Sequence, residues 1–327
     1  MATPCWPISS NSDSLPMPKP TLWFAVCASL FGLSAPGMAA PSCGASGVAL
    51  QVLGSGGPEA ADKRASSGYL LWQDGRTRLL VDAGGGVKLR FGEAGASMVD
   101  LDAVAFTHFH ADHASDFAAL VKSSYFEDRS RALPVYGPPG NAIMPGAEAF
   151  ADALFGKAGA FRYLGDFLDG SGSYTLEPQD VKADGKVVGV GTFRAMRLAA
   201  TAVEHGSLPA LAWRAEISGA VVVFSGDTSG KGDLVALARD ADVFVAHNAV
   251  PIGTTGVAHA LHMTPDDIGR IAAQARVKKL VLSHRMLRTL GREADTLAAI
   301  RVHYAGPVAF ADDLSCYPLN LNPASPK

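Results

Sequence analysis

Residues 104–120 read VAFTHFHADHASDFAAL and hold three histidines and two aspartates between two apolar runs. The chain has nine histidines in 327 residues, so three within six positions is a marked concentration. The apolar run 101–108 has the composition of a buried strand. After the cluster, apolar side chains recur at helical spacing, at Phe117, Leu120, Val121 and Tyr125. The cluster therefore lies on a loop between a strand and a helix.

This loop carries four metal-binding groups in an H-x-H-x-D-H pattern: His108, His110, Asp112 and His113. Imidazole nitrogens and a carboxylate without a thiolate suit zinc or a similar divalent ion. A lone histidine is more often a core or surface residue, but four such residues in six positions are typical of a metal site. Because a bend turns Asp112 and His113 away from the first two histidines, the loop can serve two ions.

Further ligands are expected where other apolar runs end, at His205, Asp227 and His284. Each oxygen of a carboxylate can bind one cation, so Asp227 is suited to bridge two ions. Two ions about 3.5–4 Å apart lower the pKa of a water between them and clamp the group under attack. We therefore expect two divalent ions, with zinc as the leading candidate, and hydrolytic chemistry.

The rest of the chain predicts one α/β domain over residues 41–327, with two sheets and outer helices. It is 48% hydrophobic and 18% charged, and it has no repeat or composition break. A helix should begin at Thr264, with Pro265 in its first turn and Asp267 in a capping box. Region 157–185 is poorly patterned and is predicted to be a loop or lid. Strands are expected at 47–55, 68–74, 76–86, 101–108, 133–137, 186–198, 210–217, 220–228, 242–249, 278–284 and 306–313.

The first forty residues differ from the remainder. Residues 19–40 read KPTLWFAVCASLFGLSAPGMAA, a lysine followed by a short apolar run and small residues. This pattern is typical of a signal peptide spanning 1–40, so the mature protein is expected to be periplasmic or secreted, without a membrane segment. A retained anchor and a start at Met17 remain alternatives. Export leaves Cys43 and Cys316, which either form a bridge or stay as free thiols.

The metal-binding stations resemble those of the metallo-β-lactamase fold superfamily over essentially the whole mature chain. THFHADH is similar to its metal loop, and LLVDAGGG to its first motif, whose Asp82 is implied to brace that loop. The resemblance implies a four-layer αββα sandwich. It assigns one ion to His108, His110 and His205, a second to Asp112, His113 and His284, and shares Asp227 between them.

The details resemble the ribonuclease Z and arylsulfatase-like branch. Segment 260–288, ALHMTPDDIGRIAAQARVKKLVLSHRMLR, is similar to that branch's ending. This implies that His262 donates a proton to the leaving group or clamps an anion, and that Arg288 contacts an anion. A capping role for His262 and a surface ion pair for Arg288 remain open. His247, His259 and His303 are interpreted as structural.

Departures from the branch narrow the expected substrate. Asn248 stands where tRNA-processing members carry a glutamate, and no Lys-rich arm is present. The net charge of −3 and pI near 6.3 show no basic surplus, so we expect no nucleic-acid partner. His110 replaces the glutamate of redox di-iron members, and Asp227 argues against class B β-lactamases.

The predicted function is that of an exported binuclear hydrolase of a small ester, either a sulfate ester or a phosphodiester. A metal-bridged hydroxide, aligned by Asp227 and Asp112, would attack the ester. The alternatives are a lactonase or β-lactamase-type hydrolase, and a metal-binding module without turnover. Substrate specificity is expected from loops 55–66 and 157–185. The sequence allows both a monomer and a homodimer.

Overall fold

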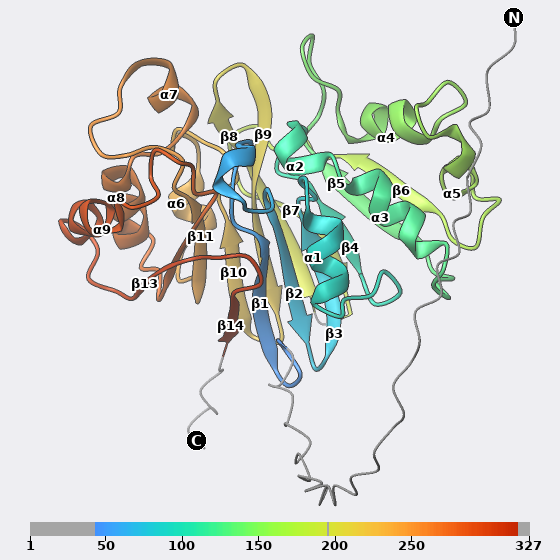
Figure 1. Cartoon of the computed structure of the whole chain (residues 1–327), viewed down its shortest axis with the longest axis horizontal. Coiled ribbons are helices and arrows are strands. Elements are labelled where there is room, and N and C mark those ends of the chain that lie inside the picture. Colours follow the sequence, from blue (N-terminus) through green and yellow to red (C-terminus); the bar gives the residue numbers. More distant parts are fainter. Residues whose placement is uncertain (1–42, 195, 320–327) are drawn as a thin grey trace, which may run out of the picture. The chain divides into compact units, whose positions relative to one another are not determined.

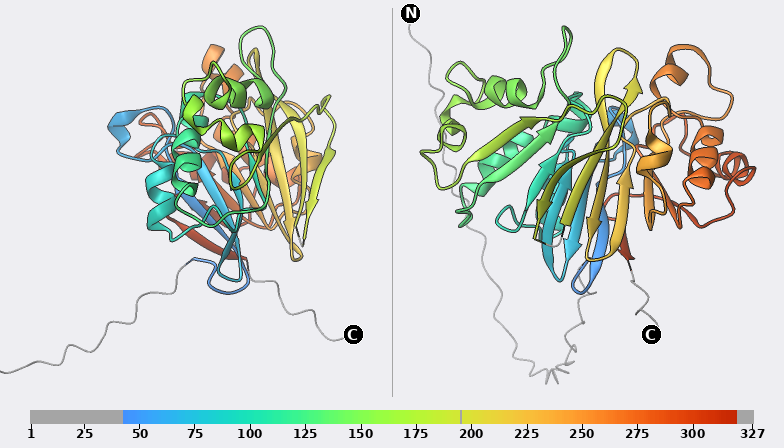
Figure 2. Two further views of the ribbon diagram at one scale, coloured as in Figure 1. Left: turned by 90° about the vertical axis from the view of Figure 1, so that its right-hand side faces the viewer. Right: turned by 180° about the vertical axis from the view of Figure 1, so that it is seen from behind.

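The computed structural model describes residues 43–194 and 196–319. The predicted signal peptide and the alternative start at Met17 lie outside the described residues. Within this part of the chain, two seven-stranded sheets pack face to face and helices cover both outer surfaces (Figures 1 and 2). The predicted αββα sandwich is confirmed.

The first sheet runs in the order β14-β1-β2-β3-β4-β5-β6. Strands β3 to β6 are parallel, whereas β1, β2 and β14 join antiparallel. Its strands are β1 (Val48–Gly54), β2 (Gly68–Gln73), β3 (Arg76–Val81), β4 (Ala103–Ala105), β5 (Leu133–Gly137), β6 (Leu176–Asp180) and β14 (Cys316–Leu319).

The second sheet runs in the order β13-β12-β11-β10-β9-β8-β7. Strands β10 to β13 are parallel, and β7, β8 and β9 form an antiparallel meander that joins β10. Its strands are β7 (Val188–Phe193), β8 (Met196–His205), β9 (Leu208–Ile217), β10 (Ala220–Phe224), β11 (Val243–His247), β12 (Leu280–Ser283) and β13 (Val308–Phe310).

Three apolar cores hold the layers together. The central core lies between the sheets and includes Trp213 and Phe224. A second core packs the first sheet against helices α1, α3, α4 and α5, and a third packs the second sheet against α6, α8 and α9. The helices are η1 (Ala60–Asp62), α1 (Val87–Glu93), α2 (Ala111–Ala114), α3 (Phe117–Ser124), α4 (Ala147–Phe155), η2 (Arg162–Leu164), α5 (Asp166–Asp169), α6 (Leu234–Leu237), α7 (Gly256–Leu261), α8 (Pro265–Gln274) and α9 (Glu293–Arg301).

The structure confirms the predicted start of one helix and differs from the predictions for two other segments. Helix α8 begins as predicted, because the Thr264 side chain accepts from the Asp267 backbone and Asp267 caps in return. Segment 186–198 is not one strand, since β7 and β8 form a hairpin across it. Region 157–185 contains η2, α5 and the edge strand β6, so it is more ordered than a loop.

The two cysteines of the predicted mature chain are joined. Cys43 and Cys316 form a disulfide across 273 residues, which settles the choice between a bridge and free thiols. The bridge ties the segment before β1 to β14, the strand that pairs with β1 at the edge of the first sheet. Among the described helices, none has the length and apolar character needed to cross a bilayer.

Candidate metal centre

The predicted ligands come from one edge of the sandwich, where strands end. The metal loop follows β4, His205 is the last residue of β8, and His284 directly follows β12. Asp227 lies three residues beyond β10. Because β8, β10, β11 and β12 run in the same direction, their carboxyl ends meet at one edge, the usual place for a site in such folds.

Two strand ends turn sharply to present polar side chains. Asp82 follows β3 with a φ of 57°, and His284 follows β12 with a φ of 51°. A non-glycine residue in the left-handed region costs on the order of 1 kcal/mol and tends to occur at functional sites. Both residues are buried in the site, so the packing around them offsets this conformational cost and holds their side chains in place.

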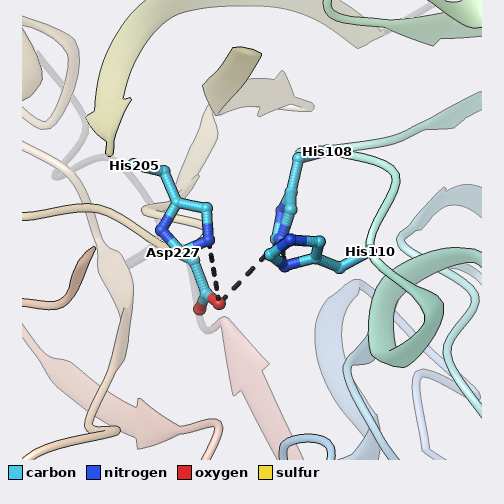
Figure 3. A group of neighbouring side chains, drawn as sticks. All are labelled: His108, His110, His205 and Asp227. Atoms are coloured by element: carbon cyan, nitrogen blue, oxygen red, sulfur yellow. Dashed lines mark hydrogen bonds and ion pairs between the residues drawn. The ribbon is translucent and has the colours of Figure 1, made fainter. Parts of the chain in front are cut away.

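The first group of donors surrounds one oxygen of Asp227. Its Oδ2 lies 3.9 Å from His108 Nε2 and 3.9 Å from His205 Nε2 (Figure 3). His110 Nδ1 lies 3.1 Å from His108 Nε2. Ligand atoms of these four residues all lie within 4.8 Å of one another, so the group can hold a single ion.

The second group lies on the other side of the same carboxylate. His284 Nε2 is 3.4 Å from Asp227 Oδ1 and 3.2 Å from Asp112 Oδ2. His113 Nε2 is 3.6 Å from Asp227 Oδ2 and 3.6 Å from Asp112 Oδ2. The structure thus brings all seven predicted ligands together, with Asp227 between the two groups.

Hydrogen bonds orient the imidazoles from behind. Asp82 lies 2.8 Å from His113 Nδ1 and also accepts from the backbone and hydroxyl of Thr107. His205 Nδ1 lies 2.9 Å from the carbonyl of Leu261. Each of these contacts engages Nδ1 and turns Nε2 toward Asp227, as in histidines that bind metals. Asp82 therefore braces the loop in the manner that the sequence implied.

The electrostatics of the edge favour bound cations. Burial opposes ionisation of Asp227, yet His284 and His113 hold its pKa well below the usual value. Burial likewise opposes charge on His113, but Asp82 and Asp227 hold its pKa well above normal. Within the described chain, the buried Nε2 atoms of His113 and His205 have no hydrogen-bond partner. Imidazole nitrogens that face buried carboxylates fit a divalent ion, which would replace the protons that these histidines otherwise hold.

His262 lies at the edge of the second group. Its Nδ1 is 3.8 Å from Asp227 Oδ1, and its side chain is 11% exposed, among the more accessible of the cluster. Burial and the neighbouring His284 lower the pKa of His262 to about 4, against the opposing effect of Asp227. The imidazole is therefore neutral at pH 7 and must take up a proton before it can donate one.

Arg288 is exposed and forms no ion pair with a carboxylate in the described chain. Its Nε donates to the carbonyl of Ala249 at 2.6 Å, and its charge contributes to the lowered pKa of His262. The side chain is anchored beside His262 with its positive charge uncompensated. That placement disfavours the surface ion-pair alternative and suits an anion contact.

His247, interpreted from sequence as structural, belongs to the site. It ends β11, and its Nδ1 lies 2.8 Å from Asp227 Oδ1. Since an ionised carboxylate only accepts, Nδ1–H donates to Asp227, and Nε2 faces the Tyr69 hydroxyl at 3.0 Å. The apolar run 242–249 ends at a strand terminus as those of His205 and His284 do, and that shared position could have identified it.

Comparisons with known proteins agree with this geometry. Residues 77–285 match the model of the β-lactamase superfamily domain. A ribonuclease Z of Mycobacterium sp. (strain KMS) is 29% identical over 285 residues, covering 82% of this chain and 94% of the relative. The metallo-β-lactamase fold protein YhfI of Bacillus subtilis aligns with a TM-score of 0.64 and 22% identity, over 83% of this chain and 98% of its own.

The human short form of tRNase Z aligns with a TM-score of 0.63 and 19% identity, over 84% of this chain and all of its own. The expectation of no nucleic-acid partner is wrong in the light of these relatives, whose names specify RNA. It rested on Asn248, on the missing Lys-rich arm and on net charge, which averages over the surface and does not report a local binding region. With more than half of its length matched, the chain belongs to the metallo-β-lactamase fold superfamily, which includes its ribonuclease Z relatives.

Proposed function

We propose that this protein is a binuclear metal-dependent phosphodiesterase. One observation carries the proposal: two donor groups meet at a shared buried carboxylate, Asp227. Sites with two ions are recurrent in the hydrolysis of phosphate esters. The similarity to a ribonuclease Z supports a phosphodiester over the sulfate ester that the sequence left equally open.

The roles of the residues follow from their positions. Bound divalent ions would lower the pKa of a water and polarise the phosphoryl group. Asp227 and Asp112 would align the attacking water, because both carboxylates border the second donor group. Arg288 would contact a non-bridging phosphate oxygen. His262, neutral at pH 7, would accept the proton of the water and return it to the departing alkoxide.

Export remains part of the proposal. The segment 1–40 has the pattern of a signal peptide. The disulfide between Cys43 and Cys316 supports it, since disulfides persist in oxidising compartments. Fractionation of cells that express the full chain would test it: the mature protein, beginning near residue 41, is expected outside the cytoplasm.

A panel of four substrates tests the activity. Zinc-loaded protein is assayed with bis-p-nitrophenyl phosphate, an aryl sulfate, an acyl lactone and a cephalosporin. We expect the highest kcat/KM on the phosphodiester, with loss on chelation and recovery on adding zinc. A higher kcat/KM on the lactone or cephalosporin would support an acyl hydrolase, and background rates on all four would support a binding module.

A further inference from the structure

A second surface with a defined chemistry lies beside the metal loop. A groove of about 490 Å³ runs between α1, α3 and the segment around η2. It begins at Ser115, two residues after His113, and follows α3 to Phe126. The helices that border it lie on the outer face of the first sheet (Figure 2, left). The groove is lined by Lys88, Ser115, Ala118, Ala119, Lys122, Ser123, Phe126, Phe161 and Tyr163.

The aromatic side chains of this groove are unusually exposed. Phe126 is 82% exposed, Tyr163 63% and Phe161 40%, and the neighbouring Tyr125 is 58% exposed. They come from two segments separated by more than thirty residues, so the fold gathers them at one place. Clustered exposed apolar rings are costly in water and mark a surface that binds a partner.

The charge of the groove selects the partner. Among the described residues that line it, two are lysines and none carries a carboxylate. The Lys122 ammonium lies 4.3 Å from the ring centroid of Tyr125, 5.3 Å from Phe126 and 5.8 Å from Tyr163. A ligand for this surface must therefore combine flat apolar faces with negative charge.

Single-stranded nucleic acid has this combination, since its bases stack on aromatic rings and its phosphates pair with lysine. The path from Ser115 to Phe126 is on the order of 15 Å at the helical rise, enough for about four stacked nucleotides. We propose that the groove of α1, α3 and η2 binds a single-stranded nucleic-acid segment next to the metal centre.

The groove does not depend on the metal ligands. None of its lining residues is among the predicted ligands, and Phe126 and Tyr163 have most of their surface in solvent. Changes there should leave the fold and the chemistry of a small diester intact. The biological use of the groove rests on the proposed function, but nucleic-acid binding there does not require catalysis. Binding and catalysis can therefore be measured separately.

The test uses fluorescence anisotropy of a labelled 12-nucleotide single-stranded RNA of mixed sequence. It compares the full mature protein, in EDTA to prevent turnover, with the variant Phe126→Ala/Tyr163→Ala. We expect Kd to rise about tenfold or more in the variant, since each stacked base contributes substantially. The variant Lys88→Gln/Lys122→Gln should weaken binding and flatten its salt dependence. The controls Val302→Ala and Lys186→Gln, which change exposed residues outside the groove, should leave Kd unchanged.

Activity of the zinc-loaded variants on bis-p-nitrophenyl phosphate separates the two proposals. Unchanged turnover with weakened RNA binding supports the groove. RNA binding that is absent from the wild type, or equal in wild type and aromatic variant, overturns the inference whether or not the diester is hydrolysed. Binding to anionic phosphatidylserine vesicles in place of RNA, or a dimer that dissociates in the aromatic variant, would assign the groove to a membrane or a second copy and overturn it as well.

Discussion

The metal edge and the aromatic groove are neighbours in the chain but opposite in construction. At the edge, ionisable groups are mostly buried, and polar groups behind them hold His113 and His205, as Asp82 holds His113. In the groove, large rings such as Phe126 are exposed and form few polar contacts. Catalysis at the metal edge would require fixed geometry, whereas binding in the groove would depend on exposed area and charge. Substitutions should therefore have sharp effects at the edge and graded effects in the groove.

The largest loss of activity is expected from Asp227→Ala. Loss of the shared carboxylate removes a contact to both donor groups, so phosphodiesterase activity should fall more than about a thousandfold. Turnover of bis-p-nitrophenyl phosphate measures this. Asp240→Ala, which removes an exposed aspartate paired with Arg276, serves as the control. Activity within tenfold of wild type would refute the role of Asp227.

His262→Ala should lower kcat about a hundredfold while both ions stay bound, because the imidazole handles a proton and is not among the predicted ligands. His259→Ala is the matched control: that histidine is exposed and contacts Asp267. Metal content and kcat are measured together. Lost metal in His262→Ala would make it a ligand, and unchanged kcat would leave it a capping residue.

Asp82→Asn probes the support of the loop. The amide keeps the size of the side chain but weakens its hold on His113 and Thr107. Changes to groups behind metal ligands typically cost 10- to 100-fold in affinity or activity. Competition with a zinc chelator should show that loss, and an unchanged zinc affinity would contradict the bracing role.

Removing the disulfide should act on stability alone. Cys43→Ser/Cys316→Ser frees the N-terminal segment and β14, and loss of a native bridge costs roughly 2–5 kcal/mol. We expect Tm to fall by about 5–10 °C. Diester turnover at 25 °C should not change. A large loss of activity in the folded double variant would show that the disulfide also positions the metal edge.

The smallest expected effect concerns pH. Burial lowers the pKa of His247 to about 4 in the folded protein, whereas an unfolded chain has the ordinary histidine pKa of about 6.5. Between these two pH values the unfolded chain takes up a proton at His247 and the folded protein does not. Its contribution to stability is complete above about pH 6.5 and declines as the pH falls toward 4. In metal-free protein, the Tm difference between wild type and His247→Gln should therefore narrow over that range. A constant difference would contradict the lowered pKa.

The features predicted correctly from the sequence are a local motif and polar residues at the ends of apolar runs. The H-x-H-x-D-H loop and the strand-end residues His205, Asp227 and His284 were expected to converge, and the structure brings them together. His247 was interpreted as structural although it ends an apolar run as His205 and His284 do, and the fold places it against Asp227.

Other features depend on contacts between distant segments. The disulfide could not be predicted with certainty, because the Cα separation of 5.7 Å between Cys43 and Cys316 is known only from the fold. The groove joins Lys88, α3 and Tyr163, which lie in separate segments and share no periodicity. Net charge is an average of the same kind, since a chain total of −3 carries no information about where lysines gather.

If two ions share Asp227, the number of ions bound per chain depends on this residue. Protein saturated with zinc and freed of excess should contain two ions per chain by elemental analysis. The Asp227→Ala variant should contain about one. One ion in the wild type, or two retained in the variant, would contradict the account.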